Sequence, residues 1–462
     1  MTRNINRDSS LVSMNDTPAL TLRSITDSDM TAENAIRIGR MVGRSYKRVC
    51  IGSDNGPNSR MVKNALISGL LSAGADVNDA DIAPAPAVAL ASKDSDCMLM
   101  VGEPNEQGTI SKIYIMGSDG SIFTQEQLRQ MIVTGMRDLP LPGYRDIGKL
   151  RLCDSADRNY NRTIREKHGK DIDTPIILDC GCGSTSVCAP QILASVGVDL
   201  TAINAQYDTQ YSPRPPGVSA DDVSNLAEFV GMELGSIGIA LNGDGTRLAL
   251  IDERGNYVDP ENILALLLMH LKPSSAVIPF NASAVVDDAF RGLIGNGVPG
   301  DAAAKEERRI IRADNDLESI TAAIKKYGAA MGAMTNGTFI FPDVTLCPDA
   351  INAAVILAKI SRDDSISCLL ASFPRYTVLR DSLYGPGNTE LFNKKLNDRL
   401  KELDTEEAWE IEGKRVRMSG GWFAIARNAD DPEHIDVTAE AKDKAYAVSM
   451  MELAKGIVRD CM

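Results

Sequence analysis

The chain has 462 residues, of which 44% are hydrophobic and 24% charged, and its formal net charge is −14. Such a composition is typical of globular proteins, and about 150 residues per domain predicts three or four domains. The negative charge argues against nucleic acid or an anionic membrane surface as a partner, because both are polyanions.

The N-terminal sequence and the cysteines favour a cytoplasmic protein. Residues 1–17 form a polar tail without the apolar segment of a secretory signal, and no apolar run reaches the ~20 residues of a membrane span. The nine cysteines are odd in number and scattered, and their spacing does not match a zinc site. Three histidines lie in three separate regions, which argues against a His-rich metal centre.

The first 150 residues alternate between helical and strand patterns. A helical pattern runs from Met30 to Tyr46 with Thr31 as the expected N-cap, and the strand VCIGSD follows it. A second amphipathic helix, SRMVKNALISGLLS, leads to further strands, one of them from Cys97 to Gly102. Alternating strands and helices predict a parallel sheet covered by helices.

The same alternation starts again twice. The segment IALNGDGTRLALIDERG, from Ile239 to Gly255, predicts a strand, a tight loop and a strand. A third unit includes the helical patterns PENILALLLMHL and DAINAAVILAKI. The last portion, from KRVRMSGGWFAIAR onward, instead indicates short antiparallel strands and a closing helix. After the tail, the expected domains are 18–150, 151–257, 258–372 and 373–462.

Three α/β units followed by a smaller α+β unit resemble the α-D-phosphohexomutase superfamily, which includes phosphoglucomutase, phosphomannomutase and phosphoglucosamine mutase. The segments that carry the resemblance are MVKNALISGLLSAGADVNDADIAPAPA, IYIMGSDGSIF, IILDCGCGST and NGTFIFPDVTLCPDAINAAVILAKI. The resemblance runs from Pro18 to the end of the chain. It implies four domains around a central cleft, three of them similar mixed-sheet α/β domains and the last an α+β domain.

The resemblance also implies four functional loops. In that family a phosphorylated serine exchanges its phosphate with a sugar phosphate, and a magnesium ion held by an acidic loop neutralises charge during the transfer. A third loop reads the sugar hydroxyls, and a fourth binds the phosphate that is not transferred. Each loop can be located in this chain by counting from the matching framework segments.

The nucleophile loop falls on residues 102–107, with Pro104 at the serine position. Proline has no hydroxyl, so a phosphoryl group cannot be carried there. Thr109 and Ser111 lie nearby, but closeness in sequence does not give them the geometry of a nucleophile. We therefore expect no catalytic residue in this loop. Among the neighbouring first-domain motifs, the family arginine is kept as Arg23 and a family aspartate as Asp54.

The metal loop falls on Asn242, Asp244 and Thr246, where the family has three aspartates, and Arg247 is retained. Magnesium prefers anionic oxygen ligands, so Asp244 is a weak metal candidate, with Asn242 and Thr246 as neutral donors. The alternative is that Asp244 and the two glycines only maintain a tight turn. We expect no cofactor, or magnesium only if it is weakly retained.

The two remaining loops have also changed. In the sugar loop, residues 332–338, Met334 replaces an acid and Asn336 and Thr338 replace a serine and a histidine. The phosphate loop, residues 427–433, keeps only Arg427, and its acidic run 430–433 repels phosphate and favours an amine-bearing ligand, unless it is simply a solvated loop. The substrate-binding positions implied by the resemblance are Arg23, Arg247, Asn336, Thr338 and Arg427.

A matching framework around altered loops predicts a phosphohexomutase-like protein without mutase activity, which acts as a partner, scaffold or regulator. Its expected partners are an active paralogue, another protein or a second copy in a homo-oligomer, and its small-molecule ligand is unknown. Two alternatives stay open. One is a repurposed cleft that binds or converts a different ligand. The other is residual phosphoglucomutase, phosphomannomutase or phosphoglucosamine mutase activity in carbohydrate metabolism.

Overall fold

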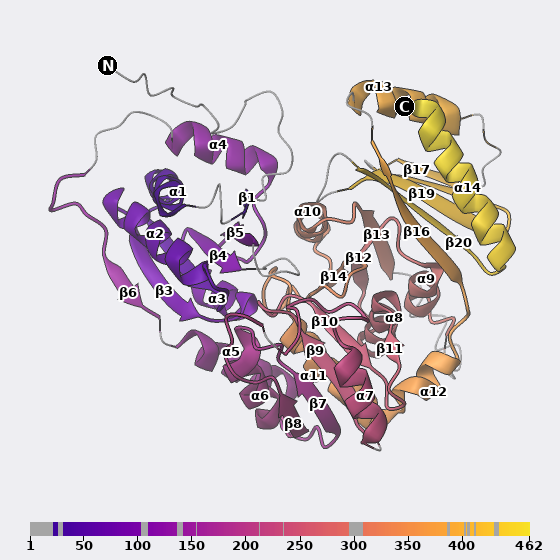
Figure 1. Ribbon diagram of the computed structural model, residues 1–462, viewed down its shortest axis with the longest axis horizontal. Helices are drawn as coiled ribbons and strands as arrows, with labels where there is room; N and C mark the ends of the chain where they lie inside the picture. The colour runs from indigo at the N-terminus through magenta and orange to yellow at the C-terminus, as the bar shows by residue number, and fades with distance from the viewer. Residues whose placement is uncertain are drawn as a thin grey trace.

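The computed structural model describes most of the chain. The described residues are 22–25, 31–102, 110–135, 142–153, 155–211, 213–233, 235–294, 308–385, 389–401, 403, 407–410, 413–428 and 434–462. They form four sheets, each with its own helices, and each sheet defines one domain, numbered I to IV along the chain (Figure 1). No helix in these ranges has the length and apolar character needed to cross a bilayer.

Domain I contains a six-stranded sheet in the order β1-β5-β4-β2-β3-β6, in which β4, β2, β3 and β6 are parallel and β5 pairs antiparallel with its two neighbours, β4 and β1. Thr31 caps the first helix by accepting a hydrogen bond from the Asn34 N–H, as predicted. The elements are β1 (Leu22–Ile25), α1 (Ala32–Ser45), β2 (Arg48–Ser53), α2 (Ser59–Ser72), β3 (Asp76–Ile82), α3 (Ala85–Ala91), the 3₁₀ helix η1 (Ser92–Asp94), β4 (Cys97–Gly102), β5 (Ile110–Gly117), α4 (Gln125–Gly135) and β6 (Leu150–Leu152).

Domain II contains a five-stranded sheet in the order β11-β10-β9-β7-β8. The strands β8, β7 and β9 are parallel, and the β9-β10 hairpin turns the sheet antiparallel at the other edge. The elements are α5 (Ala156–His168), β7 (Pro175–Asp179), α6 (Thr185–Ser195), β8 (Asp199–Ile203), α7 (Ser224–Met232), β9 (Ile237–Leu241), β10 (Leu248–Ile251) and β11 (Tyr257–Val258).

Domain III contains a four-stranded sheet in the order β13-β12-β14-β15, parallel except for the short last strand. Its helix α11 is buried on most of its surface, which explains the nearly continuous apolar run in its sequence. The elements are α8 (Pro260–Leu271), β12 (Ser275–Pro279), α9 (Ala284–Phe290), β13 (Arg309–Ala313), α10 (Leu317–Tyr327), β14 (Met331–Ala333), β15 (Phe339–Ile340), α11 (Ala350–Asp363) and α12 (Ile366–Ala371).

Domain IV differs from the others because its five-stranded sheet, in the order β16-β20-β19-β18-β17, is entirely antiparallel. The helices α13 and α14 cover one face of this sheet (Figure 1). The elements are β16 (Thr377–Tyr384), α13 (Thr389–Leu400), β17 (Glu407–Glu410), β18 (Lys414–Met418), β19 (Gly421–Arg427), β20 (His434–Ala441) and α14 (Lys444–Cys461). Three mixed sheets followed by one antiparallel sheet confirm the predicted fold class.

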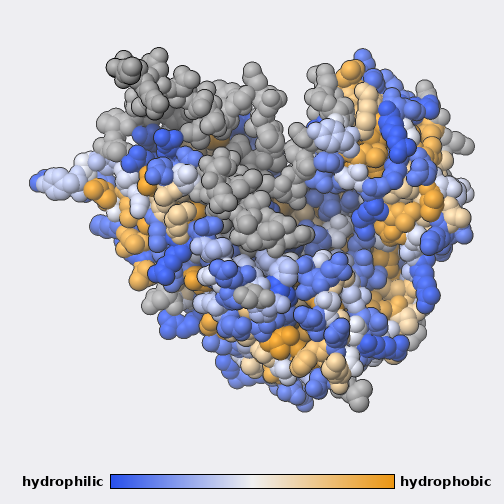
Figure 2. Space-filling view, in the orientation of Figure 1, coloured by the Kyte–Doolittle hydropathy of each residue, from blue (hydrophilic) through white to orange (hydrophobic). Residues whose placement is uncertain are grey.

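The buried apolar residues show how the domains are joined. One cluster runs through domains II and III, from helix α5 to Phe373 after helix α12, and also takes in Ala87 of helix α3 in domain I. Domain IV has a separate cluster between its sheet and helices α13 and α14. In the part of the chain that the structure describes, a small group, Phe280 with Trp422 and Ala424, packs across the boundary between domains III and IV. The face in Figure 2 is mostly hydrophilic, and apolar side chains gather toward its right-hand edge beside domain IV.

Candidate active site

The predicted metal loop is a tight hairpin between β9 and β10, as its sequence pattern indicated. Gly245 adopts a φ of 77°, a backbone conformation that favours glycine. A Cβ atom at this position would lie 2.9 Å from Thr185 Cγ2 and 3.0 Å from Pro84 Cβ, so the neighbours leave no room for a side chain. Both the backbone and the packing therefore fix the shape of the hairpin.

The polar side chains of the hairpin bond to one another. Asn242 Oδ1 accepts hydrogen bonds from the N–H groups of Thr246 and Arg247, at 2.9 Å each. Asn242 Nδ2 donates to Asp244 Oδ1 at 2.8 Å and to Thr246 Oγ1 at 3.1 Å. The Thr246 hydroxyl donates to the same Asp244 oxygen at 2.6 Å. Asn242 and Asp244 are each 1% exposed, so this network lies inside the protein.

The donor set of the hairpin does not fit a magnesium ion. Magnesium takes oxygen ligands in near-octahedral geometry, whereas the Asn242 amide directs its hydrogens at the Asp244 and Thr246 oxygens that would be ligands. The hairpin supplies one carboxylate. Within the described ranges, no group of three or more His, Cys, Asp or Glu side chains is arranged to hold a metal.

The backbone of the hairpin connects three domains. The Asp244 carbonyl accepts a hydrogen bond from the Ala85 N–H of domain I at 2.9 Å. The Gly245 carbonyl accepts one from the Ala350 N–H of domain III at 3.1 Å. These bonds use the main chain, which leaves the side-chain network on the inner side of the hairpin intact. The hairpin is therefore a junction where domains I, II and III meet.

The predicted sugar loop lies directly against the hairpin. Arg247 and Thr338 form an isolated antiparallel bridge, and the Leu248 N–H donates to the Gly337 carbonyl at 3.2 Å. Thr338 is buried and Asn336 is exposed, so the loop presents Asn336 to solvent while Thr338 fixes it to the hairpin. The structure thus brings together two of the four loops that the sequence predicted to share a cleft.

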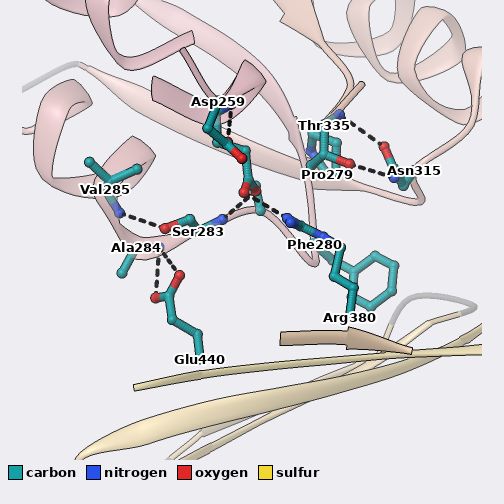
Figure 3. Close-up of polar contacts among 12 residues, drawn as sticks. Asp259, Pro279, Phe280, Ser283, Ala284, Val285, Asn315, Thr335, Arg380 and Glu440 are labelled. Carbon is teal, nitrogen blue, oxygen red and sulfur yellow. Dashed lines mark hydrogen bonds and ion pairs between the residues drawn. The ribbon is translucent and has the colours of Figure 1, made fainter. Parts of the chain in front are cut away.

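A pair of polar side chains anchors the sugar loop to its own domain, as Figure 3 shows. Asn315 Nδ2 donates to Thr335 Oγ1 at 2.9 Å, and the Thr335 N–H donates back to Asn315 Oδ1 at 3.3 Å. This reciprocal pair holds the loop from one side while the hairpin holds it from the other. The exposed Asn336 side chain is therefore carried on a fixed backbone.

On the domain I side, Asp54 lies where the predicted nucleophile loop begins. A Cβ atom on Gly102 would lie 3.1 Å from Asp54 Oδ2. Asp54 Oδ1 accepts hydrogen bonds from the Gly56 N–H at 2.9 Å and from the Ser59 hydroxyl. Asp54 is 1% exposed. The aspartate that the sequence retained is thus a buried, fixed carboxylate beside the first residue of the predicted nucleophile loop.

Tyr211 is a residue of this region that the sequence patterns did not single out. It is 5% exposed and has a φ of 50°, which is uncommon for a bulky aromatic residue. Its hydroxyl would lie 3.3 Å from a Cβ atom on Gly243 of the hairpin. Burial, together with the nearby Asp54 and Asp244 carboxylates, raises the pKa of Tyr211. The only signal in the sequence is its place at the start of the proline-rich run YSPRPP.

Arg427, the residue kept from the predicted phosphate loop, ends strand β19 of domain IV and is half-buried. Asp436 lies one register position away on β20. The Asp436 carboxylate accepts hydrogen bonds from Ser382 Oγ at 2.9 Å and from Asn428 Nδ2 at 2.9 and 3.1 Å. Neutral donors therefore hold this carboxylate in place.

Two buried carboxylates join domain IV to domain III (Figure 3). Glu261 of α8 accepts a hydrogen bond from the Ser283 N–H at 2.7 Å and forms an ion pair with Arg380 of β16 at 2.6 Å. Burial raises the pKa of Glu261, and the Arg380 charge opposes that rise. Glu440 of β20, 1% exposed, accepts hydrogen bonds from the Ala284 N–H at 3.0 Å and from Trp422 Nε1 at 2.9 Å.

Several predicted positions lie outside the described residues. They are Pro104 and Thr109 of the nucleophile loop and the acidic run 430–433 of the phosphate loop. The backbone of Arg23 belongs to β1 and pairs with Lys112 of β5, but its side chain is likewise outside the description. The roles assigned to these residues stay predictions.

Comparisons with known proteins cover nearly the whole chain. Residues 21–138 match the family model for phosphoglucomutase/phosphomannomutase, alpha/beta/alpha domain I. A protein of Methanocella arvoryzae named "Probable phosphoglucosamine mutase" is 29% identical over 454 residues, which cover 96% of this chain and 97% of that protein. A protein of Methanosarcina barkeri with the same name is 27% identical, over 96% of this chain and 98% of that protein.

The fold has a similar counterpart among solved structures. A phosphoglucomutase/phosphomannomutase family protein from Burkholderia thailandensis superimposes with a TM-score of 0.82 at 17% sequence identity. The match covers 95% of this chain and 96% of the other. At this identity the likeness supports the four-domain architecture and nothing finer.

The prediction of a homologue without mutase activity is wrong. It rested on single positions in four loops, whereas the similarity to probable phosphoglucosamine mutases extends through all four domains at 27–29% identity. This similarity supports an active mutase, which was one of the two alternatives, and gives no support to a role as scaffold or regulator.

Proposed function

Because the chain belongs to the α-D-phosphohexomutase superfamily, we propose that it interconverts the 1- and 6-phosphates of a hexose, with glucosamine phosphate as the preferred substrate. The observation that carries the proposal is the full-length similarity to proteins named as probable phosphoglucosamine mutases. The contact between the hairpin and the sugar loop adds support, because a mutase site requires these segments to share one cleft.

The substrate is proposed to lie at the junction of the hairpin and the sugar loop. There the exposed Asn336 amide can both donate and accept hydrogen bonds to sugar hydroxyls. Glucosamine also carries an ammonium group, and the acidic run at residues 430–433 suits a cation. An amine-bearing sugar phosphate therefore agrees with the charge of this chain better than a neutral hexose phosphate does.

A mutase of this kind needs a group that carries a phosphoryl between the two sugar oxygens. Pro104 cannot be that group, because it has no hydroxyl. Thr109 and Ser111 are the hydroxyl-bearing residues of the same segment. The proposal therefore requires that a residue other than 104 is phosphorylated, and phosphopeptide mapping of the purified protein identifies it.

The activity is tested by following glucosamine 6-phosphate with phosphorus NMR in the presence of a sugar bisphosphate primer. We expect glucosamine 1-phosphate to accumulate, and an Asn336→Ala variant to reduce the rate by ~10-fold or more. The control is Asn256→Ala, in the exposed turn at the other end of β10. Absence of turnover with glucosamine, glucose and mannose phosphates alike would refute the proposal.

We also propose that the protein is cytoplasmic. All nine cysteines are free, and seven of them are buried. Unpaired buried thiols suit a reducing compartment. Fractionation of the native host, followed by detection of the protein in the soluble reduced fraction, tests this location.

A further inference from the structure

We propose that the Asn242 side-chain amide takes the place of a divalent cation in the hairpin 242–247, so that the protein builds its cleft without a bound metal. The inference concerns the hairpin and does not depend on the proposed mutase activity. It rests on three observations: the direction of the amide, the charge of the hairpin and the way the hairpin is fixed to its neighbours.

The hydrogen bonds define the direction of the Asn242 amide. Its Oδ1 atom accepts from two backbone N–H groups, those of Thr246 and Arg247. A backbone N–H can only donate, so this end of the amide must be the oxygen. The Nδ2 end therefore points to the interior of the hairpin, where it donates to Asp244 Oδ1 and Thr246 Oγ1.

The charge inside the hairpin is already balanced by donors. Asp244 Oδ1 accepts three hydrogen bonds from within the hairpin, from Asn242 Nδ2, the Thr246 hydroxyl and the Thr246 N–H, at 2.6 to 3.1 Å. Hydrogen bonds to a carboxylate stabilise its charged form. A loop of three carboxylates repels itself until a cation binds, but this loop holds one carboxylate and a set of neutral donors. The attraction for a dication is correspondingly weak.

The position of the hairpin is also set without an ion. Its carbonyl oxygens accept hydrogen bonds from Ala85 of domain I and Ala350 of domain III, and Gly337 of the sugar loop accepts one from Leu248. Asn242 and Asp244 are each 1% exposed. A cation that entered would have to displace buried hydrogen bonds and would not add order to a hairpin that is already fixed.

The test restores the missing carboxylates in the full-length protein. In the double variant Asn242→Asp/Thr246→Asp, three carboxylates face one another in a buried hairpin, so we expect a lower melting temperature without metal and recovery on addition of Mn²⁺. Electron paramagnetic resonance of Mn²⁺ should show binding at least ~10-fold tighter than in the wild type. The wild type should bind no stoichiometric Mn²⁺, and neither Mg²⁺ nor a chelator should shift its melting temperature.

The matched control is Asn256→Asp. Asn256 donates to Asp252 in a turn at the other end of β10, as Asn242 donates to Asp244, but the change there creates only two neighbouring carboxylates. It should not gain Mn²⁺ affinity. If the double variant does not fold, Thr246→Asp alone, on a half-buried residue, replaces it with the same expected direction.

Each outcome decides the inference. Stoichiometric Mn²⁺ binding by the wild type that Asn242→Leu abolishes would overturn it. If neither the wild type nor the folded carboxylate variants bind Mn²⁺ measurably, then Asn242 and Thr246 are not what prevents metal binding in the hairpin, and the inference is also overturned. Because the readouts are metal binding and melting temperature, a failure here differs from a failure of the mutase proposal, which is read by turnover.

Discussion

The junction of domains I, II and III and the junction of domains III and IV are held together in different ways. At the first, main-chain hydrogen bonds from the hairpin reach two other domains, and one apolar cluster runs through domains II and III. At the second, a small apolar group and a few charged side chains make the contact: Arg380 pairs with Glu261, Glu440 accepts a hydrogen bond from the Ala284 N–H, and Arg415 donates to the Phe280 and Ala282 carbonyls.

The two junctions therefore differ in how easily the domains on either side can move. A main-chain junction with a continuous core changes position only if hydrogen bonds and packing break together. The second junction is held by side chains around a small apolar contact. Interfaces of this kind occur between domains that shift relative to each other. We infer that the hairpin and the sugar loop form the fixed wall of the cleft and that domain IV is the part whose position can adjust.

The largest expected effect on stability is in the hairpin 242–247. Asn242→Ala removes the donors and acceptor of a buried network and leaves the Asp244 carboxylate and two N–H groups with fewer partners. We expect a loss of about 3 to 5 kcal/mol in the free energy of unfolding. Urea denaturation measures it, and Asn256→Ala in the exposed turn should lose less than ~1 kcal/mol. Similar losses in both variants would contradict the special role of the hairpin.

The next largest effect is a dependence of stability on pH, which arises from a buried carboxylate between domains II and III. Burial raises the pKa of Asp349, the N-cap of α11, from 3.8 to about 6, and its carboxylate accepts hydrogen bonds from Tyr160 Oη at 2.5 Å and the Asn352 N–H at 2.8 Å. The folded protein therefore binds this proton more tightly than the unfolded chain, so the contribution of Asp349 to stability falls as pH rises from about 4 to 6.

Asp349→Asn keeps both hydrogen bonds and removes this titration. Relative to the wild type, the variant should gain roughly 3 kcal/mol in the free energy of unfolding between pH 4 and pH 7, because each unit of pKa shift corresponds to about 1.4 kcal/mol. Urea denaturation at several pH values checks the slope. A constant difference between the two proteins across this range would contradict the raised pKa.

A smaller effect is expected at the adjustable junction. Glu440→Ala removes the acceptor of the Ala284 N–H and the Trp422 indole N–H, and should cost about 2 kcal/mol. The loss should appear in the transition of domain IV, followed by the fluorescence of Trp409 and Trp422, which both lie in that domain, with little change in domains I to III. The control is Glu452→Ala on the exposed side of α14. Loss of stability in all four domains together would mean that domain IV is as tightly coupled as the others.

The smallest effect on stability is expected for an exposed ion pair between domains I and III. Lys325 forms an ion pair with Asp119 at 2.9 Å, and the two side chains are 51% and 45% exposed. Water and salt screen such a pair, so Lys325→Met should change the free energy of unfolding by no more than about 0.5 kcal/mol. A loss above ~2 kcal/mol in urea would show that surface charges, rather than the hairpin, hold this junction.

Much of the fold could be predicted from the sequence because local patterns determined it. The helix capped by Thr31, the strand from Cys97 to Gly102 and the hairpin around Asp244 all appear where periodicity and turn residues placed them. The placement of the metal and sugar loops by family resemblance was also informative, since the two loops are in contact.

The contacts that define the two junctions could not be predicted, because they join residues far apart in sequence. Tyr160 and Asp349 are 189 positions apart, and Glu440 and Ala284 are 156 apart, and no local pattern marks either pair. Tyr211 was missed for a similar reason, since the residues near its hydroxyl, Gly243 and Asp54, are distant from it in sequence. The prediction of inactivity failed because single loop residues were given more weight than similarity along the whole chain.

The most direct test of this account is a phosphorus NMR time course with glucosamine 6-phosphate and a bisphosphate primer, run once with magnesium and once with a chelator. The account predicts glucosamine 1-phosphate at comparable rates in both samples. Turnover only with magnesium would contradict the metal-free hairpin, and no turnover in either sample would contradict the mutase itself.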